Sequence, residues 1–137
     1  MTQKRGEILF VCIENSSRSQ MAEGFARARG LNASSAGTFP ASHVNPLVVE
    51  AMLEEGIDVS KYKTKPLSEE LIDKTDIIVL TDAALEEKLP KNLRKEMGKK
   101  LVTWSIPDPQ GQPMEVVRFA RNQIKKDVDG LIREMEH

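Results

Sequence analysis

The chain has 137 residues, a length that suits one domain with one hydrophobic core. Charged residues make up 30% of it and the formal net charge is -1, so the sequence lacks the excess of basic residues that is typical of nucleic-acid-binding proteins. No apolar run approaches the about 20 residues needed to span a bilayer, and the polar segment 1–7 lacks the apolar stretch of a signal peptide. We therefore expect a single domain over residues 1–137 in the cytoplasm, with neither nucleic acid nor a membrane as a partner.

Cys12 is the only cysteine, which excludes an intramolecular disulfide and fits a reducing compartment. A single thiol also excludes zinc sites built from several cysteines, and His43 and His137 have no paired ligand spacing. We expect no metal and no cofactor.

The first elements predicted are a strand, a polar loop and a helix. Residues 8–13 form an apolar, β-branched run typical of a buried strand. Residues 21–29 have helical periodicity and end at Gly30, a common residue after a helix. Together they predict the start of a βα unit.

The rest of the chain continues the alternation. Small residues at 32–37 predict a second strand, and Asn45 can cap a helix that has Pro46 in its first position and ends at Gly56. Ser68 begins a short helix, and residues 77–80 form an all-apolar strand of the kind found in parallel sheets covered on both faces. Residues 101–104 predict a fourth strand and residues 114–135 a long amphipathic helix. This pattern predicts one doubly wound α/β domain.

The polar loop lies where such folds bind ligands, outside the carboxyl end of a strand. Cys12 ends the first strand and Arg18 stands before the first helix. Backbone N–H groups between them can form a nest for an anion, to which the helix N-terminus adds donors and partial positive charge. The same field favours a cysteine thiolate. The predicted ligand is a tetrahedral oxyanion, bound by Ile13, Glu14, Asn15, Ser16, Ser17 and Ser19.

Individual residue types fit this interpretation. Arg18 has a planar guanidinium group that can hold two oxygens. Ser19 is placed to donate a hydrogen bond to the sulfur of Cys12. Asn15 tolerates the left-handed backbone conformation that a tight cradle needs.

A simpler interpretation competes with the functional one. Most lone cysteines are small buried hydrophobic residues, and a Cys-x5-Arg pair by itself is a common accident. Cys12 and Arg18, however, lie between a buried strand and a helix start, with Asn15 and three serines filling the loop. This combination favours the functional interpretation.

The sequence resembles the low-molecular-weight protein tyrosine phosphatase superfamily, specifically its arsenate reductase branch. The resemblance runs in order through nearly the whole chain, in the segments Cys12-Ile13-Glu14-Asn15-Ser16-Ser17-Arg18-Ser19-Gln20-Met21-Ala22-Glu23-Gly24, Ser35-Ala36-Gly37-Thr38, Val44-Asn45-Pro46, Glu50-Ala51-Met52, Gly56-Ile57-Asp58-Val59-Ser60 and Asp108-Pro109. It implies a four-stranded parallel sheet flanked by helices. It also implies that Cys12 is the nucleophile, that Arg18 holds the oxygens, and that Asp108 protonates the leaving group and then activates water.

Asp108 also has a local interpretation. It lies between Pro107 and Pro109 in a loop that follows the predicted fourth strand. An Asp-Pro pair often does no more than make a turn. The position at the same sheet edge as Cys12 favours a catalytic role.

The sequence departs from the resembled branches in three places. Thioredoxin-coupled arsenate reductases carry two further cysteines at positions that match Asp82 and Leu89 here, so an internal disulfide relay is impossible. Tyrosine phosphatases have aromatic residues near the Asp-Pro pair, whereas this chain offers only Phe39, His43 and Tyr62 as wall residues, and Phe39 and Tyr62 fit the core or the surface equally well. Glu14 places a carboxylate on an anion-binding loop, where it either points away, repels the ligand, or selects substrates with a positive neighbour.

Three functions remain open from the sequence. The first is a cysteine-dependent phosphate monoester hydrolase acting through a cysteinyl-phosphate intermediate, with a phosphotyrosine protein as one candidate substrate. The second is an arsenate reductase that uses an external thiol reductant. The third is a non-catalytic module that binds phosphate or arsenate, although such a module needs no acid like Asp108.

Overall fold

The computed structural model describes residues 6–136, apart from the side chain of Lys99. His137, considered above as a metal ligand, lies outside the described residues. The elements, in chain order, are β1 (Ile8–Cys12), α1 (Arg18–Ala28), β2 (Ala33–Gly37), α2 (Pro46–Leu53), α3 (Glu69–Asp73), β3 (Ile77–Leu80), η1 (Ala83–Lys88), α4 (Lys91–Met97), η2 (Gly98–Lys100), β4 (Leu101–Thr103) and α5 (Met114–Met135).

The four strands form one parallel sheet in the order β2-β1-β3-β4. The register pairs Cys12 with Gly37 and Val11 with Leu80, so the carboxyl ends of the central strands lie at one edge of the sheet. Each parallel connection must cross over the sheet, and the crossovers carry the helices. The predicted four-stranded α/β fold is therefore confirmed.

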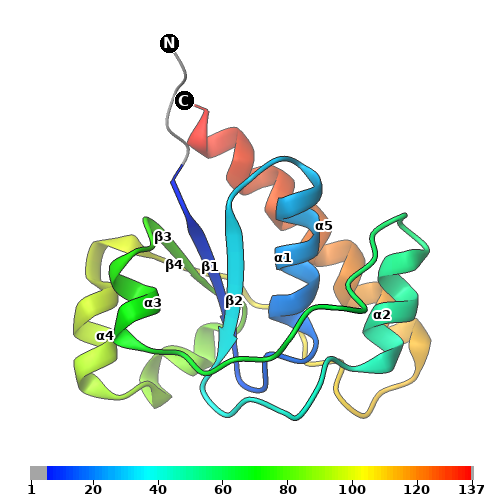
Figure 1. Ribbon diagram of the computed structural model, residues 1–137, viewed down its shortest axis with the longest axis horizontal. Helices are drawn as coiled ribbons and strands as arrows, with labels where there is room; N and C mark the ends of the chain where they lie inside the picture. The colour runs from blue at the N-terminus through cyan, green and yellow to red at the C-terminus, as the bar shows by residue number, and fades with distance from the viewer. Residues whose placement is uncertain (1–5, 137) are drawn as a thin grey trace.

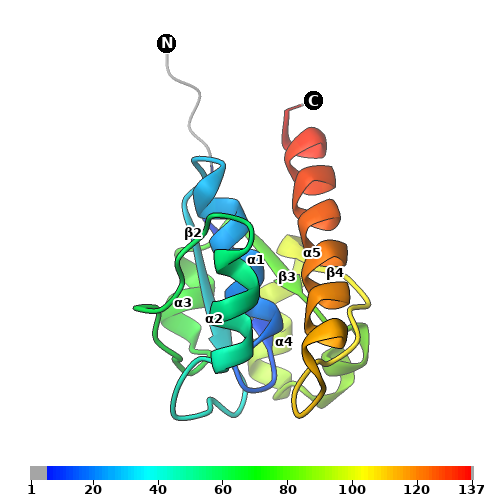
Figure 2. The same ribbon diagram turned by 90° about the vertical axis from the view of Figure 1, so that its right-hand side faces the viewer.

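Alternate residues of β1 face two separate hydrophobic cores. Ile8 and Phe10 pack in the cluster formed with α1, α2 and α5, whereas Leu9 and Val11 pack in the cluster formed with α3, η1 and α4. Figure 1 shows these two groups of helices on opposite sides of the sheet, and Figure 2 shows α1 and α5 side by side. Burial on both faces explains the continuous apolar character of β1 and β3.

The sequence-based elements agree with the structure to within one or two residues except in three places. Helix α2 ends at Leu53, three residues before the predicted end at Gly56. Helix α1 begins at Arg18, one turn before the predicted start at residue 21. The segment 83–100 contains three short helices, where we predicted no element. Its apolar side chains recur every four residues (Leu85, Leu89, Leu93 and Met97), but Pro90 divides the pattern into a 3-10 helix and an α-helix.

None of the helices within residues 6–136 combines the length and the apolar character that crossing a membrane requires. The longest, α5, has 22 residues and charged side chains along its exposed face.

Candidate active site

The loop between β1 and α1 is held from outside by the segment 38–45. The backbone N–H groups of Phe39 and Ala41 donate to the carbonyls of Ile13 and Glu14 at 2.7 and 2.9 Å. The N–H of Asn45 donates to the carbonyl of Ser16 at 2.9 Å. Because these carbonyls are occupied on the outer side, the loop has a fixed curvature.

Asn15 has the tight backbone conformation predicted for it, with φ at 53°. Gly37, at the end of β2, makes room for this turn. A Cβ atom at Gly37 would lie 2.7 Å from the carbonyl oxygen of Ile13 and 2.8 Å from the amide nitrogen of Asn15. The loop can therefore take this shape only because β2 ends on a glycine.

A chain of hydrogen bonds leads from the segment below the loop to the sulfur of Cys12. The backbone N–H of Lys65 donates to Oδ1 of Asn15 at 2.9 Å, so the Nδ2 group faces Ser19 and donates to its hydroxyl at 2.7 Å. Ser19 Oγ lies 2.9 Å from Cys12 Sγ. The hydroxyl keeps one proton and one lone pair, and because a Cys12 thiolate can only accept, the hydroxyl donates its proton to the sulfur when Cys12 is ionised. The predicted contact between Ser19 and Cys12 is present.

Arg18 is buried at the start of α1, with a side chain only 2% exposed. Its Nη1 donates to the carbonyl of Ile106 at 2.9 Å and to Oδ2 of Asp82 at 3.1 Å. Its Nη2 lies 3.7 Å from Oδ2 of Asp108, and its Nε is buried without a hydrogen-bond partner among the described residues. The bonds at Nη1 hold the guanidinium plane and leave the Nε–Nη2 edge for a ligand.

Asp108 lies on the loop after β4, and its side chain is 48% exposed. Its Oδ1 accepts the backbone N–H of Gln110 at 3.0 Å, while Oε1 of Gln110 accepts the hydroxyl of Ser16 at 3.3 Å. The Asp108 loop is thus tied to the opposite rim of the site.

One pocket brings together most of the predicted residues. It is lined by Cys12, Ile13, Glu14, Ser16, Ser17, Arg18, Asp108 and Gln110. Asn15 and Ser19 do not line it, because they are buried beneath the loop and contact the sulfur and the backbone from behind.

Sequence reasoning missed two residues of the site, Asp82 and Gln110. Asp82 directly follows β3, so the rule that placed Cys12 and Asp108 at the carboxyl edge of the sheet applies equally to it. Gln110 follows Asp108 by two residues on the same loop, where the sequence analysis compared the chain with tyrosine phosphatases only for aromatic residues near the Asp-Pro pair.

None of the three candidate wall residues lines the pocket. Tyr62 is half-buried against the core beneath the guanidinium group of Arg27, 5.3 Å from the ring centroid, and burial raises the pKa of its hydroxyl. His43 is exposed and shares a hydrogen bond with Ser42. Phe39 is 78% exposed, on the segment that holds the loop.

Within residues 6–136, no group of three or more His, Cys, Asp or Glu side chains lies close enough together to hold a metal ion. The charged centre of the pocket is instead Arg18, beside the buried thiol of Cys12. This arrangement suits recognition of an anion by donors and a positive charge supplied by the protein itself.

Comparison with curated proteins finds relatives along nearly the whole chain. An arsenate reductase from Staphylococcus aureus (strain Newman) is 37% identical over 96% of this chain and 98% of its own length. A glutaredoxin arsenate reductase from a Synechocystis strain is 35% identical over 92% of this chain and 95% of its own length.

Solved structures with the same fold include three enzymes of different activity. A low molecular weight protein tyrosine phosphatase from T. tengcongensis superposes with a TM-score of 0.84 at 30% identity, covering 93% of this chain and 98% of its own. An arginine phosphatase from Geobacillus stearothermophilus gives 0.87 at 26% identity, covering 96% and 93%. An arsenate reductase in the phosphate binding state gives 0.80 at 31% identity, covering 94% and 98%.

The model of one family, low molecular weight phosphotyrosine protein phosphatase, matches residues 7–137. This match spans the sheet, the loop after β1 and the Asp108 loop together. The chain therefore belongs to the low molecular weight phosphotyrosine protein phosphatase family, a family of enzymes that extends to arsenate reductases.

Proposed function

We propose that the protein is a cysteine-dependent phosphate monoester hydrolase. The observation that carries this proposal is that Cys12, Arg18 and Asp108 meet in one pocket of a chain that has no second cysteine. These three residues suffice for hydrolysis, whereas disulfide-linked reduction requires a further thiol.

In the first step, the thiolate of Cys12 attacks the phosphorus and forms a cysteinyl phosphate, while the bond to the ester oxygen breaks. Asp108 gives its proton to the departing oxygen. In the second step, the Asp108 carboxylate takes a proton from water, the resulting hydroxide attacks the phosphorus, and the Cys12 thiolate leaves with inorganic phosphate as the product.

The geometry of Arg18 supports this mechanism. Its Nε and Nη2 groups form one edge of the guanidinium plane and can donate to two oxygens of the transferred group. Asp82 and the carbonyl of Ile106 fix the plane from the other side through Nη1. Donors that are already oriented require little reorganisation as charge develops on the oxygens in the transition state.

Arsenate reduction with an external thiol is the second candidate, favoured by the names of the curated relatives. In such a reaction the arsenate adduct of Cys12 is resolved by a thiol from another molecule, since Asp82 and Leu89 occupy the positions that match the relay cysteines. Binding of phosphate or arsenate as such follows from either candidate, and the arsenate reductase solved in its phosphate binding state supports it. A module that only binds the oxyanion would not need Asp108 as a proton donor.

The deciding experiment compares the wild type with Cys12→Ser and Asp108→Asn on aryl phosphates and on arsenate plus glutathione or glutaredoxin. We expect hydrolysis of aryl phosphate that Cys12→Ser abolishes. Asp108→Asn should slow phenyl phosphate more than para-nitrophenyl phosphate, because the nitrophenolate leaves without needing a proton. Thiol-dependent formation of arsenite, without hydrolysis of aryl phosphate, would instead establish the second candidate.

Asp73→Asn is the matched control for Asp108→Asn. Asp73 ends α3, is exposed, and precedes the start of β3, whereas the pocket lies at the carboxyl ends of the strands. The same loss of a carboxylate at this position should leave both substrates unaffected.

A further inference from the structure

The pocket holds at least as much negative as positive charge, whether or not Asp108 carries its proton. Arg18 is the one cation among its lining residues, and two carboxylates, Glu14 and Asp108, line the pocket with it. A third carboxylate, Asp82, accepts a hydrogen bond from Arg18 on the far side of the guanidinium group. Arg18 therefore does not leave the site with a surplus of positive charge for a dianionic ligand.

Two of these carboxylates have roles already described, since Asp82 holds Arg18 and Asp108 transfers the proton. Glu14 has neither role. It is part-exposed, its backbone carbonyl is held by the N–H of Ala41, and it takes part in none of the ion pairs formed within residues 6–136. Its negative charge is thus present at the rim of the pocket without a protein partner.

Such a charge has opposite effects on two kinds of phosphate ester. It repels the phosphate dianion of every substrate to a similar degree. It attracts a positive charge carried elsewhere on the substrate, close to the phosphorylated position. The balance of the two effects favours substrates that bring a cation with them.

Phe39 does not line the pocket, but it adds an exposed aromatic residue beside the turn of the loop that carries Glu14. Its backbone N–H donates to the carbonyl of Ile13 at 2.7 Å, next to Glu14 in the loop, and its side chain is 78% exposed. The face of an aromatic ring attracts ammonium and guanidinium groups. A carboxylate residue and an exposed aromatic residue are therefore held against the same turn of the loop.

We propose that Glu14 determines specificity, making the site prefer phosphoryl compounds in which a positively charged group lies beside the phosphorylated position, as in a protein segment with lysine or arginine next to the phosphorylated residue. This inference rests on the proposed function, because it names the substrate class of the same site. Asp108 acts on the departing oxygen whatever charge the substrate carries elsewhere, whereas Glu14 discriminates among substrates by that charge.

The test measures binding rather than turnover. Benzylphosphonate and its para-aminomethyl derivative carry the same phosphonate and differ by one positive charge. Their dissociation constants are measured by calorimetry at low ionic strength for the wild type, Glu14→Gln and Glu14→Lys. We expect the wild type to bind the cationic ligand about three- to tenfold more tightly, as a single partly screened charge pair provides. The ratio should approach one in Glu14→Gln and reverse in Glu14→Lys.

Glu134→Gln is the matched control, since Glu134 is exposed in the last turn of α5. Figure 1 shows this end of α5 near the start of β1, whereas the pocket lies after the carboxyl end of β1. This variant should keep the wild-type ratio. An equal affinity of the wild type for the two ligands, or a ratio that Glu14→Gln leaves unchanged, would overturn the proposal. Tight binding without hydrolysis of any aryl phosphate would contradict the proposed function alone, and a failure to bind either phosphonate would overturn both.

Discussion

The side-chain amide of Asn15 donates a hydrogen bond to the hydroxyl of Ser19 over 2.7 Å, and this bond decides what Ser19 offers to Cys12. A hydroxyl has one proton, and one of its lone pairs is occupied by the amide. The sulfur lies 2.9 Å away, and once it is a thiolate it can only accept, so the hydroxyl donates its proton to it. A donor in this position stabilises the thiolate more than the thiol, because only the thiolate is a strong acceptor.

Ser19→Ala should slow the chemistry of Cys12 without closing the pocket. Loss of a hydrogen bond to a charged acceptor costs about 1.5–3 kcal/mol, which corresponds to a roughly ten- to hundredfold slower reaction of the sulfur. The measurement is the rate at which iodoacetamide alkylates Cys12 near neutral pH, followed by mass spectrometry. Ser34→Ala, on β2 and outside the pocket, is the control. An unchanged rate would mean that the proton of Ser19 does not reach the sulfur.

Asn15 itself combines a backbone and a side-chain role, and two variants separate them. Asn15→Gly keeps the left-handed conformation at little cost but loses the bonds to Lys65 and Ser19. Asn15→Ala loses the same two hydrogen bonds and also places an alanine in the left-handed conformation. It should therefore be less stable than Asn15→Gly by about 1–2 kcal/mol, the cost of a Cβ atom in the left-handed region. Urea denaturation of the two variants gives the difference directly. Equal stabilities would show that the loop relaxes out of the left-handed conformation when Asn15 is replaced.

Local patterns in the sequence predicted what depends on local chemistry. The cap at Asn45, the strand 77–80 and the left-handed conformation of Asn15 are properties of a few adjacent residues, and the structure has all three. The position of Cys12 at a strand end also followed from a short run of apolar residues. These features depend on propensities that act within a single turn or strand.

Contacts between distant residues were the part that the sequence did not predict. Arg18 and Asp82 are 64 positions apart, and the strand-end rule brings both to one edge of the sheet without indicating that their side chains contact each other. The helices within segment 83–100 escaped prediction for a different reason, because Pro90 interrupts an otherwise regular four-residue pattern. The comparison with thioredoxin-coupled arsenate reductases pointed to Asp82 only because a cysteine is absent from this position. The structure shows that the Asp82 carboxylate contacts Arg18.

Gly37→Ala should disturb the loop from behind. The added methyl group would approach the backbone of Ile13 and Asn15 to 2.7–2.8 Å, and backbone atoms in a tethered loop cannot move away cheaply. We expect a loss of about 1–3 kcal/mol in stability, together with a fall in phosphate affinity. Urea denaturation and calorimetry with inorganic phosphate check the two effects.

Gly130→Ala is the matched control for this substitution. Gly130 lies within α5, and the nearest atom to an added Cβ, apart from its own helix backbone, is 3.8 Å away on the flexible side chain of Arg133. Alanine in a helix should stabilise the protein by about 0.5–1 kcal/mol and leave phosphate affinity unchanged. If both variants lowered phosphate affinity alike, close approach at Gly37 would not be the reason.

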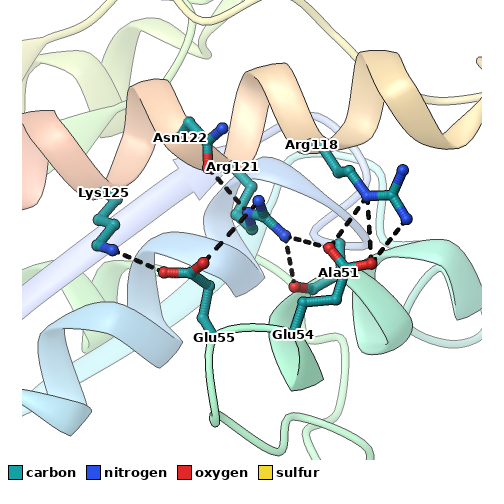
Figure 3. Close-up of polar contacts among 7 residues, drawn as sticks. All are labelled: Ala51, Glu54, Glu55, Arg118, Arg121, Asn122 and Lys125. Carbon is teal, nitrogen blue, oxygen red and sulfur yellow. Dashed lines mark hydrogen bonds and ion pairs between the residues drawn. The ribbon is translucent and has the colours of Figure 1, made fainter.

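Helix α2 is clamped to α5 by a network of charged side chains at the end of α2, shown in Figure 3. Arg118 donates to Glu54 from Nε and Nη2, and the buried Arg121 donates to Glu54 and to the carbonyl of Ala51. Lys125 pairs with Glu55 at 2.7 Å. At its other end α2 begins after Asn45, whose backbone N–H holds the carbonyl of Ser16. The clamp therefore stabilises the helix that supports the outer side of the loop.

The network predicts a specific dependence of stability on pH. Hydrogen bonds from Arg118, and next from Arg121, lower the pKa of Glu54 from 4.5 to about 2. A carboxyl whose pKa is lowered by folding stabilises the folded state fully above its unfolded value, and this contribution is lost as the pH falls towards the folded value. The window for Glu54 thus extends from about pH 4.5 down to about pH 2.

Glu54→Gln tests this contribution. Burial raises the pKa of Asp127, but this group titrates alike in the wild type and in the variant and cancels in the comparison. A hydrogen bond from Lys125 lowers the pKa of Glu55 and the charge of Glu54 raises it, so the comparison also contains this smaller coupling between the two carboxyls. We expect the wild type to be the more stable protein by a constant margin above the window and the margin to vanish towards its acid end. Urea midpoints measured along the pH range give the margin, and high salt should reduce it because the carboxylate is 37% exposed. A margin that persists unchanged through the window would mean that the ionised form of Glu54 contributes nothing to holding α2 against α5.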